Sequence, residues 1–148
     1  MIDLKEILDD WKKDCQISET HLDESSRKVP LLHSKYLEKL MNAKLFLKRT
    51  EFTQKTLLKQ KWLYYNGKMD KDEIEKLEWD PDPFDGLKVL KGEMDYYYDS
   101  DPEIQKSEEK IQYYKTVVET LTEIINNLNW RHQTISNIIK WKQFQSGN

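Results

Sequence analysis

The sequence predicts an all-α protein, and three observations support this prediction. The four glycines and four prolines among the 148 residues fall at a few positions, so long stretches contain no helix breaker. In two of these stretches apolar residues recur at spacings of three and four, which is typical of amphipathic helices. Charged residues make up 34% of the chain and the mean hydropathy is -0.90, so the polar faces are wide and the core is lean.

The first predicted helix covers residues 3–14. Asp3 and Glu6 have the spacing of a capping box, in which each side chain accepts a backbone N–H of the first turn. Ile7, Leu8 and Trp11 then supply one apolar face of the helix.

A much longer amphipathic helix is predicted from about residue 20 to residue 65. Pro30 interrupts it, and because proline removes a backbone donor, we expect a kink or a fresh helix start there. Asn66 and Gly67 form a typical C-terminal stop. Residues 70–79 and 87–97 predict two shorter helices, separated by a proline-rich acidic loop.

The last helix has the clearest start, with Asp101 as N-cap and Pro102 at the first helical position. Residues 103–145 contain neither glycine nor proline and would form a rod of roughly 65 Å. A compact domain of this length has a radius of gyration of only about 15 Å, so we expect the helix to need a partner subunit. Its near-heptad apolar stripe supplies the predicted oligomerisation residues Ile111, Tyr114, Val118, Leu121, Ile125, Leu128, Ile135 and Ile139.

These patterns predict two regions, an N-terminal helical region over residues 1–100 and a C-terminal oligomerisation helix over residues 101–148. The whole would be an all-α, coiled-coil-like homo-oligomer. The alternative is that the last helix folds back within its own chain as a hairpin, although no glycine or proline marks a turn.

Several functional classes lack their characteristic residues. The chain has neither a phosphate-binding GxxxxGK motif nor a GxGxxG motif. One cysteine, Cys15, and three histidines offer no zinc-ligand spacing, so we expect no metal, no cofactor and no enzymatic activity. No run of about 18 apolar residues exists, so we expect no membrane association, and the highly charged start is unlike a signal peptide.

The net charge of -3 conceals an uneven distribution. Residues 35–71 hold ten Lys or Arg against three Asp or Glu, a local charge of +7, whereas residues 72–109 hold four against fourteen, a local charge of -10. Because a polyanion responds to the local field, a weakly acidic protein can still bind nucleic acid.

The basic region includes lysines interleaved with aromatic residues, which is the composition that binds a single nucleic-acid strand. Lysines neutralise phosphates, while aromatic faces stack on bases at roughly 1 to 3 kcal/mol each. The alternative is that the rings form the core face of the helix and the lysines its solvated face. The candidate DNA-binding residues are Lys48, Arg49, Lys55, Lys59, Lys61, Trp62, Tyr64, Tyr65 and Lys68.

Two segments resemble the UvsY recombination mediators of T-even and related tailed bacteriophages. The segment LKQKWLYYNG at residues 58–67 is similar to the family's L-K-x-[KR]-x-x-Y-Y-x-G pattern. The block at residues 101–147, which includes Arg131 at a basic position of the family, is similar too and ends in F-x-x-G. Residues 70–86 depart from the family.

The resemblance implies a recombination mediator in the cytoplasm of the infected bacterial host, active in recombination, repair and recombination-dependent replication. It implies a ring-shaped homo-oligomer, with a heptamer as one candidate size, that binds single-stranded DNA without sequence preference. Its other partners would be a RecA-like phage recombinase and the phage single-strand-binding protein, which the mediator helps the recombinase to replace. The implied DNA contacts are Lys59 and Lys61. A helical coiled-coil scaffold without DNA binding, or a protein that prefers RNA or duplex DNA, are the rival hypotheses.

Overall fold

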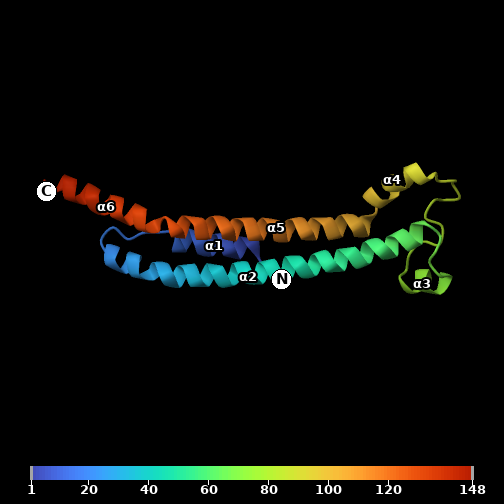
Figure 1. The fold of residues 1–148 in the computed structure, drawn as a ribbon, viewed down its shortest axis with the longest axis horizontal. Helices are drawn as coiled ribbons and strands as arrows, with labels where there is room; N and C mark the ends of the chain where they lie inside the picture. Colours follow the sequence, from blue (N-terminus) through green and yellow to red (C-terminus); the bar gives the residue numbers. More distant parts are fainter. Residues whose placement is uncertain (1, 148) are drawn as a thin grey trace. The chain divides into compact units, whose positions relative to one another are not determined.

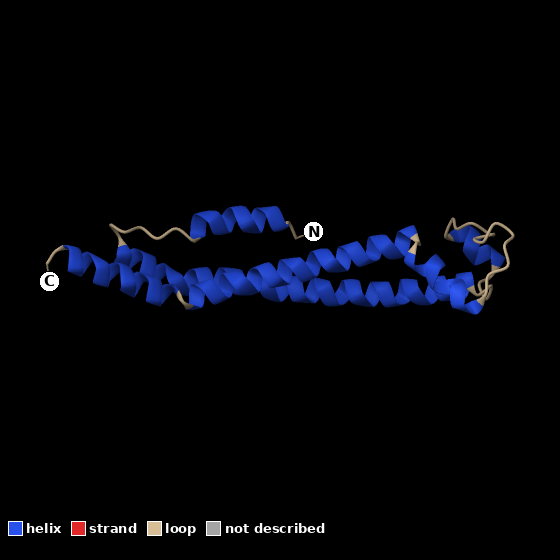
Figure 2. Cartoon of the chain, turned by 90° about the horizontal axis from the view of Figure 1, so that it is seen from above, coloured by secondary structure: helices blue, strands red, loops and turns tan. Residues whose placement is uncertain are grey.

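The computed structural model describes residues 2–147, and within them it contains helices and loops but no strand (Figure 2). The all-α prediction is therefore confirmed. The helices follow one another as in Figure 1: α1 (Leu4–Asp14), α2 (Leu22–Tyr65), α3 (Lys71–Lys76), the 3-10 turn η1 (Lys91–Glu93), α4 (Met94–Asp99), α5 (Pro102–Asn129) and α6 (Arg131–Gln145). None of the described helices combines the length and the apolar character needed to cross a membrane.

Local sequence determines the start of α1 and the end of α2, as predicted. At α1 the Asp3 carboxylate accepts the backbone N–H groups of Lys5 and Glu6 at 2.9 and 3.4 Å, which is the Asp3 half of the predicted capping box. At the end of α2, Gly67 adopts a φ of +67°, a left-handed conformation that glycine enters at no steric cost. The N–H of Gly67 donates to the carbonyl of Tyr64 and the N–H of Lys68 to that of Leu63, which closes the helix.

Pro30 lies inside α2, which runs without interruption from Leu22 to Tyr65. No fresh helix start occurs there, so that part of the expectation is wrong. Proline leaves one carbonyl of the preceding turn, that of Ser26, without its helical donor. Both Ser26 and Pro30 are exposed, so water can satisfy this carbonyl and the helix tolerates the residue.

The predicted single C-terminal helix is wrong, because two helices meet at Trp130. Around this residue the backbone forms tighter i to i+3 bonds, from Trp130 N–H to the Asn127 carbonyl and from Gln133 N–H to the Trp130 carbonyl. The next residue, Arg131, is buried and donates to the backbone carbonyls of Asp14 and Gln16 at 2.9 and 2.7 Å. The break between α5 and α6 therefore coincides with a long-range contact, although no glycine or proline lies there.

The chain forms two compact units that are discontinuous in sequence. The first unit contains the residues up to Phe46 together with those from Tyr114 onward, and the second contains residues 47–113. Each unit takes one segment of α2 and one of α5, so the boundary expected between residues 100 and 101 does not coincide with this division. In the second unit Gln54 contacts Glu108, six residues beyond the start of α5, whereas the later Lys61 contacts Asp101, so the two segments run antiparallel.

The first unit packs aromatic side chains of α1, α2 and α5. The Trp11 ring meets the Tyr36 ring edge-on at 5.5 Å, and the Phe46 and Tyr114 rings stack at 5.9 Å. The Tyr36 hydroxyl also donates to the carboxylate of Asp14 at 2.7 Å. The buried apolar side chains of this unit are Ile7, Tyr36, Leu40, Ala43, Tyr114, Val117, Leu121, Ile124, Leu128 and Ile135.

The predicted oligomerisation stripe is largely covered within its own chain. Its buried members are Ile111, Tyr114, Leu121, Leu128 and Ile135. Val118 and Ile125 are half-buried, and Ile139 is 42% exposed. The expectation that the chain itself could not cover this helix is therefore wrong for the five buried members of the stripe.

Candidate nucleic-acid interface

The second unit has its core at the end of α2, where Tyr64 and Tyr65 are 7% and 8% exposed. Both phenol groups are engaged, because the Tyr64 hydroxyl donates to the backbone carbonyl of Asp80 and the Tyr65 hydroxyl donates to the carboxylate of Asp101 at 2.6 Å. Met69 completes the buried centre of the cluster. Around it pack the partly buried side chains of Leu63, Ile74, Leu77, Trp79, Phe84, Met94, Tyr97 and Tyr98.

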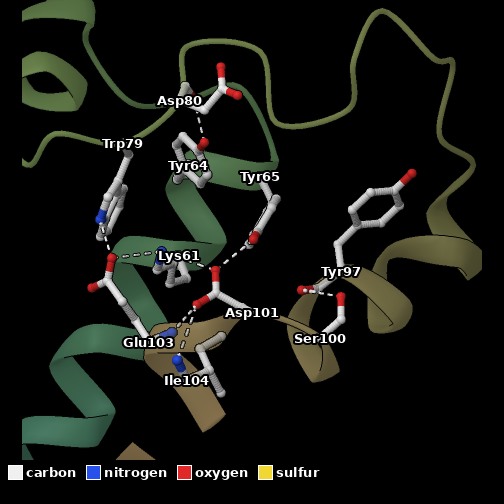
Figure 3. A network of polar contacts seen from close by, with 10 residues as sticks. All are labelled: Lys61, Tyr64, Tyr65, Trp79, Asp80, Tyr97, Ser100, Asp101, Glu103 and Ile104. Atoms are coloured by element: carbon white, nitrogen blue, oxygen red, sulfur yellow. Dashed lines mark hydrogen bonds and ion pairs between the residues drawn. The ribbon is translucent and has the colours of Figure 1, made fainter. Parts of the chain in front are cut away.

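Lys61 lies beside this core in a cage of acidic and aromatic groups (Figure 3). It is 4% exposed, and its Nζ lies 3.0 Å from a carboxylate oxygen of Asp101 and 3.4 Å from one of Glu103. The same ammonium lies 3.8 Å from the centre of the Trp79 ring and 5.5 Å from that of the Tyr64 ring. The charge is therefore buried but fully compensated.

Asp101 joins α2 to the start of α5. One carboxylate oxygen accepts the N–H groups of Glu103 and Ile104 at 2.9 and 3.1 Å, which is the predicted N-cap. The other oxygen takes the contacts from Tyr65 and Lys61. Burial alone would raise the pKa of Asp101, but hydrogen bonds from Tyr65, Lys61 and the Ile104 backbone lower it below its usual 3.8.

Acid should unfold the protein. The free energy of unfolding should begin to fall as the carboxylates of Asp101 and Asp14 take up protons. A carboxylate whose pKa is depressed in the folded state contributes stability that is fully present above its unfolded value, near 3.8, and is lost as the pH falls through the folded value. The pKa of Asp14 is lowered too, since hydrogen bonds from Lys35 and Tyr36 outweigh its burial. Urea titrations followed by circular dichroism should show a constant free energy of unfolding down to about pH 5 and a fall below it. An Asp101→Asn variant should show a shallower fall, and an equal slope would contradict the role given to this carboxylate.

Three predicted strand-binding residues are thus part of the core. Lys61, Tyr64 and Tyr65 have little open surface in this structure, and their polar atoms already have partners. The rings cannot stack on a base without opening the cluster. For these three residues the alternative interpretation, that the end of α2 carries a core face, is the better one, and we leave them out of the candidate interface.

Other members of the predicted set are exposed on α2 together with one aromatic residue that was not predicted. Lys48, Phe52, Lys55, Lys59 and Trp62 follow one another at alternating spacings of four and three, which places all five on one face of a helix. We call these five residues the lysine–aromatic stripe. Phe52 is 56% and Trp62 46% exposed, so both rings are accessible.

Each ring of the stripe lies close to ammonium groups. The Phe52 ring centre is 5.2 Å from the Nζ of Lys48 and 5.8 Å from that of Lys55. Beyond the end of α2, the Nζ of Lys68 lies 4.5 Å from the Trp62 ring centre, so this predicted residue joins the same aromatic group. Each pair places an ammonium group next to an aromatic ring.

The electrostatic environment leaves the middle of the stripe cationic. Lys48 lies 3.8 Å from a carboxylate oxygen of Glu51, a partly exposed pair that neutralises little in water. Among the described residues, no carboxylate lies within 4.0 Å of the ammonium of Lys55 or Lys59. Arg49 is exposed but follows Lys48 directly, so it points about 100° away from the centre of the stripe.

Phe52 is the functional candidate that the sequence prediction missed. It lies before the dense basic segment at residues 55–68, where composition alone does not draw attention to it. The spacing of four from Lys48 and three to Lys55 would have identified it, because those spacings place three side chains on one face of α2.

Comparison with known proteins gives a consistent set of matches. A family model described as recombination, repair and ssDNA binding protein UvsY matches residues 10–148. The recombination protein uvsY of Enterobacteria phage T4 is 25% identical over 144 residues, which cover 97% of this chain and 98% of that protein. A lattice type II crystal structure of the bacteriophage T4 recombination mediator protein UvsY gives a TM-score of 0.81 at 25% identity and covers 99% of both chains. A lattice type I structure of the same protein gives 0.78 at 25% identity and covers 95% of this chain and 98% of that one.

Proposed function

Because the chain belongs to the UvsY family of recombination, repair and single-stranded-DNA-binding proteins, we propose that it is a recombination mediator that binds single-stranded DNA through the lysine–aromatic stripe. The observation that carries the proposal is the exposure of Lys55, Lys59, Phe52 and Trp62 on one face of α2. The ammonium groups neutralise phosphates, and the two rings stack on bases of any sequence.

We further propose that copies of the chain assemble into a ring. The surface that remains for this contact is on α6, where Ile139, Trp141 and Phe144 are 42%, 59% and 71% exposed. Half-buried Val118 and Ile125 are further candidates, whereas the buried members of the predicted stripe belong to the fold of the single chain. A ring multiplies one weak stripe into many linked ones, which raises avidity without new contacts.

In this proposal the mediator acts in the cytoplasm of the infected host. Holding a strand along successive stripes extends or bends it, which disfavours the phage single-strand-binding protein and favours a RecA-like phage recombinase. Mediation then uses binding free energy alone, with no catalytic step and no cofactor. These partners and the displacement step rest on family membership together with the cationic, aromatic surface.

Fluorescence anisotropy with a labelled oligothymidine, at low and high salt, tests the proposed binding. We expect tight binding that weakens steeply with salt, because bound lysines release counterions from the strand, and poor competition by duplex DNA. A second assay then measures whether the protein speeds recombinase loading onto a strand covered by single-strand-binding protein. Absence of strand binding at low salt would leave a helical scaffold as the better account.

The two aromatic side chains of the stripe should contribute to affinity separately from charge. We expect Phe52→Ala and Trp62→Ala each to weaken oligothymidine binding by about 1 to 3 kcal/mol, with an unchanged salt slope, since stacking involves no counterions. Tyr96→Ala is the matched control, because Tyr96 is 75% exposed and lies outside the stripe. Anisotropy titrations at several salt concentrations provide both quantities. Equal losses in the control would show that the effect is not local to the stripe.

A further inference from the structure

A polar cavity of about 320 Å³ lies in the first unit, between the end of α1, the start of α2 and the start of α6. None of its lining residues belongs to the lysine–aromatic stripe. Positively charged and hydroxyl side chains dominate its lining, which includes Lys13, Lys28, Arg131, Ser18 and Ser25, with Asp14 as its one carboxylate. The composition of the cavity is that of an anion site.

Arg131 is the buried group of this cavity, at 4% exposure. Two of its nitrogens donate to the backbone carbonyls of Asp14 and Gln16, at 2.9 and 2.7 Å. Its Nε is also buried but finds no hydrogen-bond partner among the described residues. A buried N–H without an acceptor is destabilising, so the guanidinium beside the cavity keeps part of its hydrogen-bonding capacity unsatisfied.

The single carboxylate of the lining does not cancel the positive charge. Asp14 is already held by the Lys35 ammonium at 2.6 Å and the Tyr36 hydroxyl at 2.7 Å, both on α2. Lys13, Lys28 and the guanidinium therefore remain as an excess of cations around one cavity. In a partly enclosed site such an excess favours an anion over a neutral molecule.

Hydroxyl groups complete the donor set on the side of α2. Ser25 is buried at 8% exposure, and its Oγ accepts the backbone N–H of Ser18 at 3.2 Å. Within the described part of the chain, no acceptor takes the hydroxyl hydrogen of Ser25, which can therefore donate to a ligand. Arginine, lysine and serine donors around one polar space match the several oxygens of a phosphate group.

We propose that this cavity binds a phosphate group through Lys13, Lys28, Ser25 and Arg131. A bound water could satisfy one donor but would leave the excess of cations uncompensated. The phosphate could be free inorganic phosphate or a phosphodiester of the DNA strand, and the two sources share the same chemistry. Occupancy would hold the junction of α5 and α6 against the loop after α1, because Arg131 contacts both the cavity and that loop.

The test compares the full-length protein with a Lys13→Gln, Lys28→Gln variant, whose two exchanged side chains are exposed and leave the core intact. The control is Lys12→Gln, which removes a charge from the neighbouring exposed position that does not line the cavity. Thermal unfolding is recorded in sodium phosphate and in sodium chloride of equal ionic strength. Oligothymidine anisotropy is recorded separately in chloride.

If free phosphate is the ligand, it should raise the melting temperature of the wild type and of the control by about 4 °C at roughly ten times its dissociation constant, and leave the double variant unchanged. If the strand supplies the phosphate, the double variant should lose about 1.4 from its log–log salt slope for oligothymidine while the control does not, as two phosphate contacts predict. Either outcome supports the site. The absence of both effects would overturn the proposed site. Strand binding itself could persist in that case, because the stripe belongs to the other unit.

Discussion

Replacing Lys61 by alanine should destabilise the folded protein by about 3 to 5 kcal/mol. The substitution leaves the carboxylate of Asp101 buried without its cation, and it also removes the ammonium from the face of the Trp79 ring. Urea denaturation followed by circular dichroism should show an earlier midpoint with a similar slope. A loss of this size identifies Lys61 as a structural residue.

Lys59→Ala is the matched control for this experiment, because Lys59 is two positions away on the same helix and exposed. We expect its stability to change by less than about 0.5 kcal/mol, as for other surface substitutions. Should Lys61→Ala be as stable as Lys59→Ala, the cage of Figure 3 would not describe Lys61 in solution. Strand binding by a Lys61 variant should therefore be measured only under conditions where circular dichroism shows that the variant is folded.

Replacing both Lys55 and Lys59 by glutamine should weaken oligothymidine binding on the order of tenfold at low salt without loss of stability. These ammonium groups lie in the centre of the lysine–aromatic stripe and are exposed, so their removal costs phosphate contacts but no packing. The log–log salt slope should fall by about 1.4, since each contact with a single strand accounts for about 0.7.

The matched control is a Lys106→Gln, Lys110→Gln variant. These two lysines have the same spacing of four residues and are exposed on α5 in the same unit. This variant has the same net charge as the Lys55→Gln, Lys59→Gln variant. With both variants also measured at 0.1 M salt, we expect the affinity of this control to remain within about twofold of wild type there, because long-range effects of charge are screened over about 10 Å. Equal weakening in both variants would mean that net charge, rather than the stripe, determines binding.

The elements that could be predicted from the sequence are those that depend on near neighbours along the chain. Asp3, Asp101 and Gly67 cap helices through residues two to five positions away, so their roles follow from local sequence. The exposed lysines of α2 were likewise predicted, because helical spacing alone groups them on one face.

The buried part of the candidate site could not be predicted, because its contacts join distant residues. Tyr65 meets Asp101 across 36 positions, and Arg131 meets Asp14 across 117. Helical periodicity shows that a side chain lies on a given face but not which element covers that face. Composition around Lys61 therefore predicted a solvated cation, whereas the fold supplies two carboxylates and an aromatic ring.

The strand contact and the fold depend on the helical phase of α2 more than on its number of charges. Lys59 and Lys61 lie on opposite sides of one helical turn, the first exposed and the second buried. A single residue inserted or deleted between Phe52 and Lys59 would rotate everything beyond it by about 100°, separating Phe52 from Trp62 on the outer face. Lysine can be exchanged for arginine on that face with little structural consequence, but a gap cannot be absorbed. Related sequences should therefore align without insertions or deletions over residues 48–65, even where few identities remain.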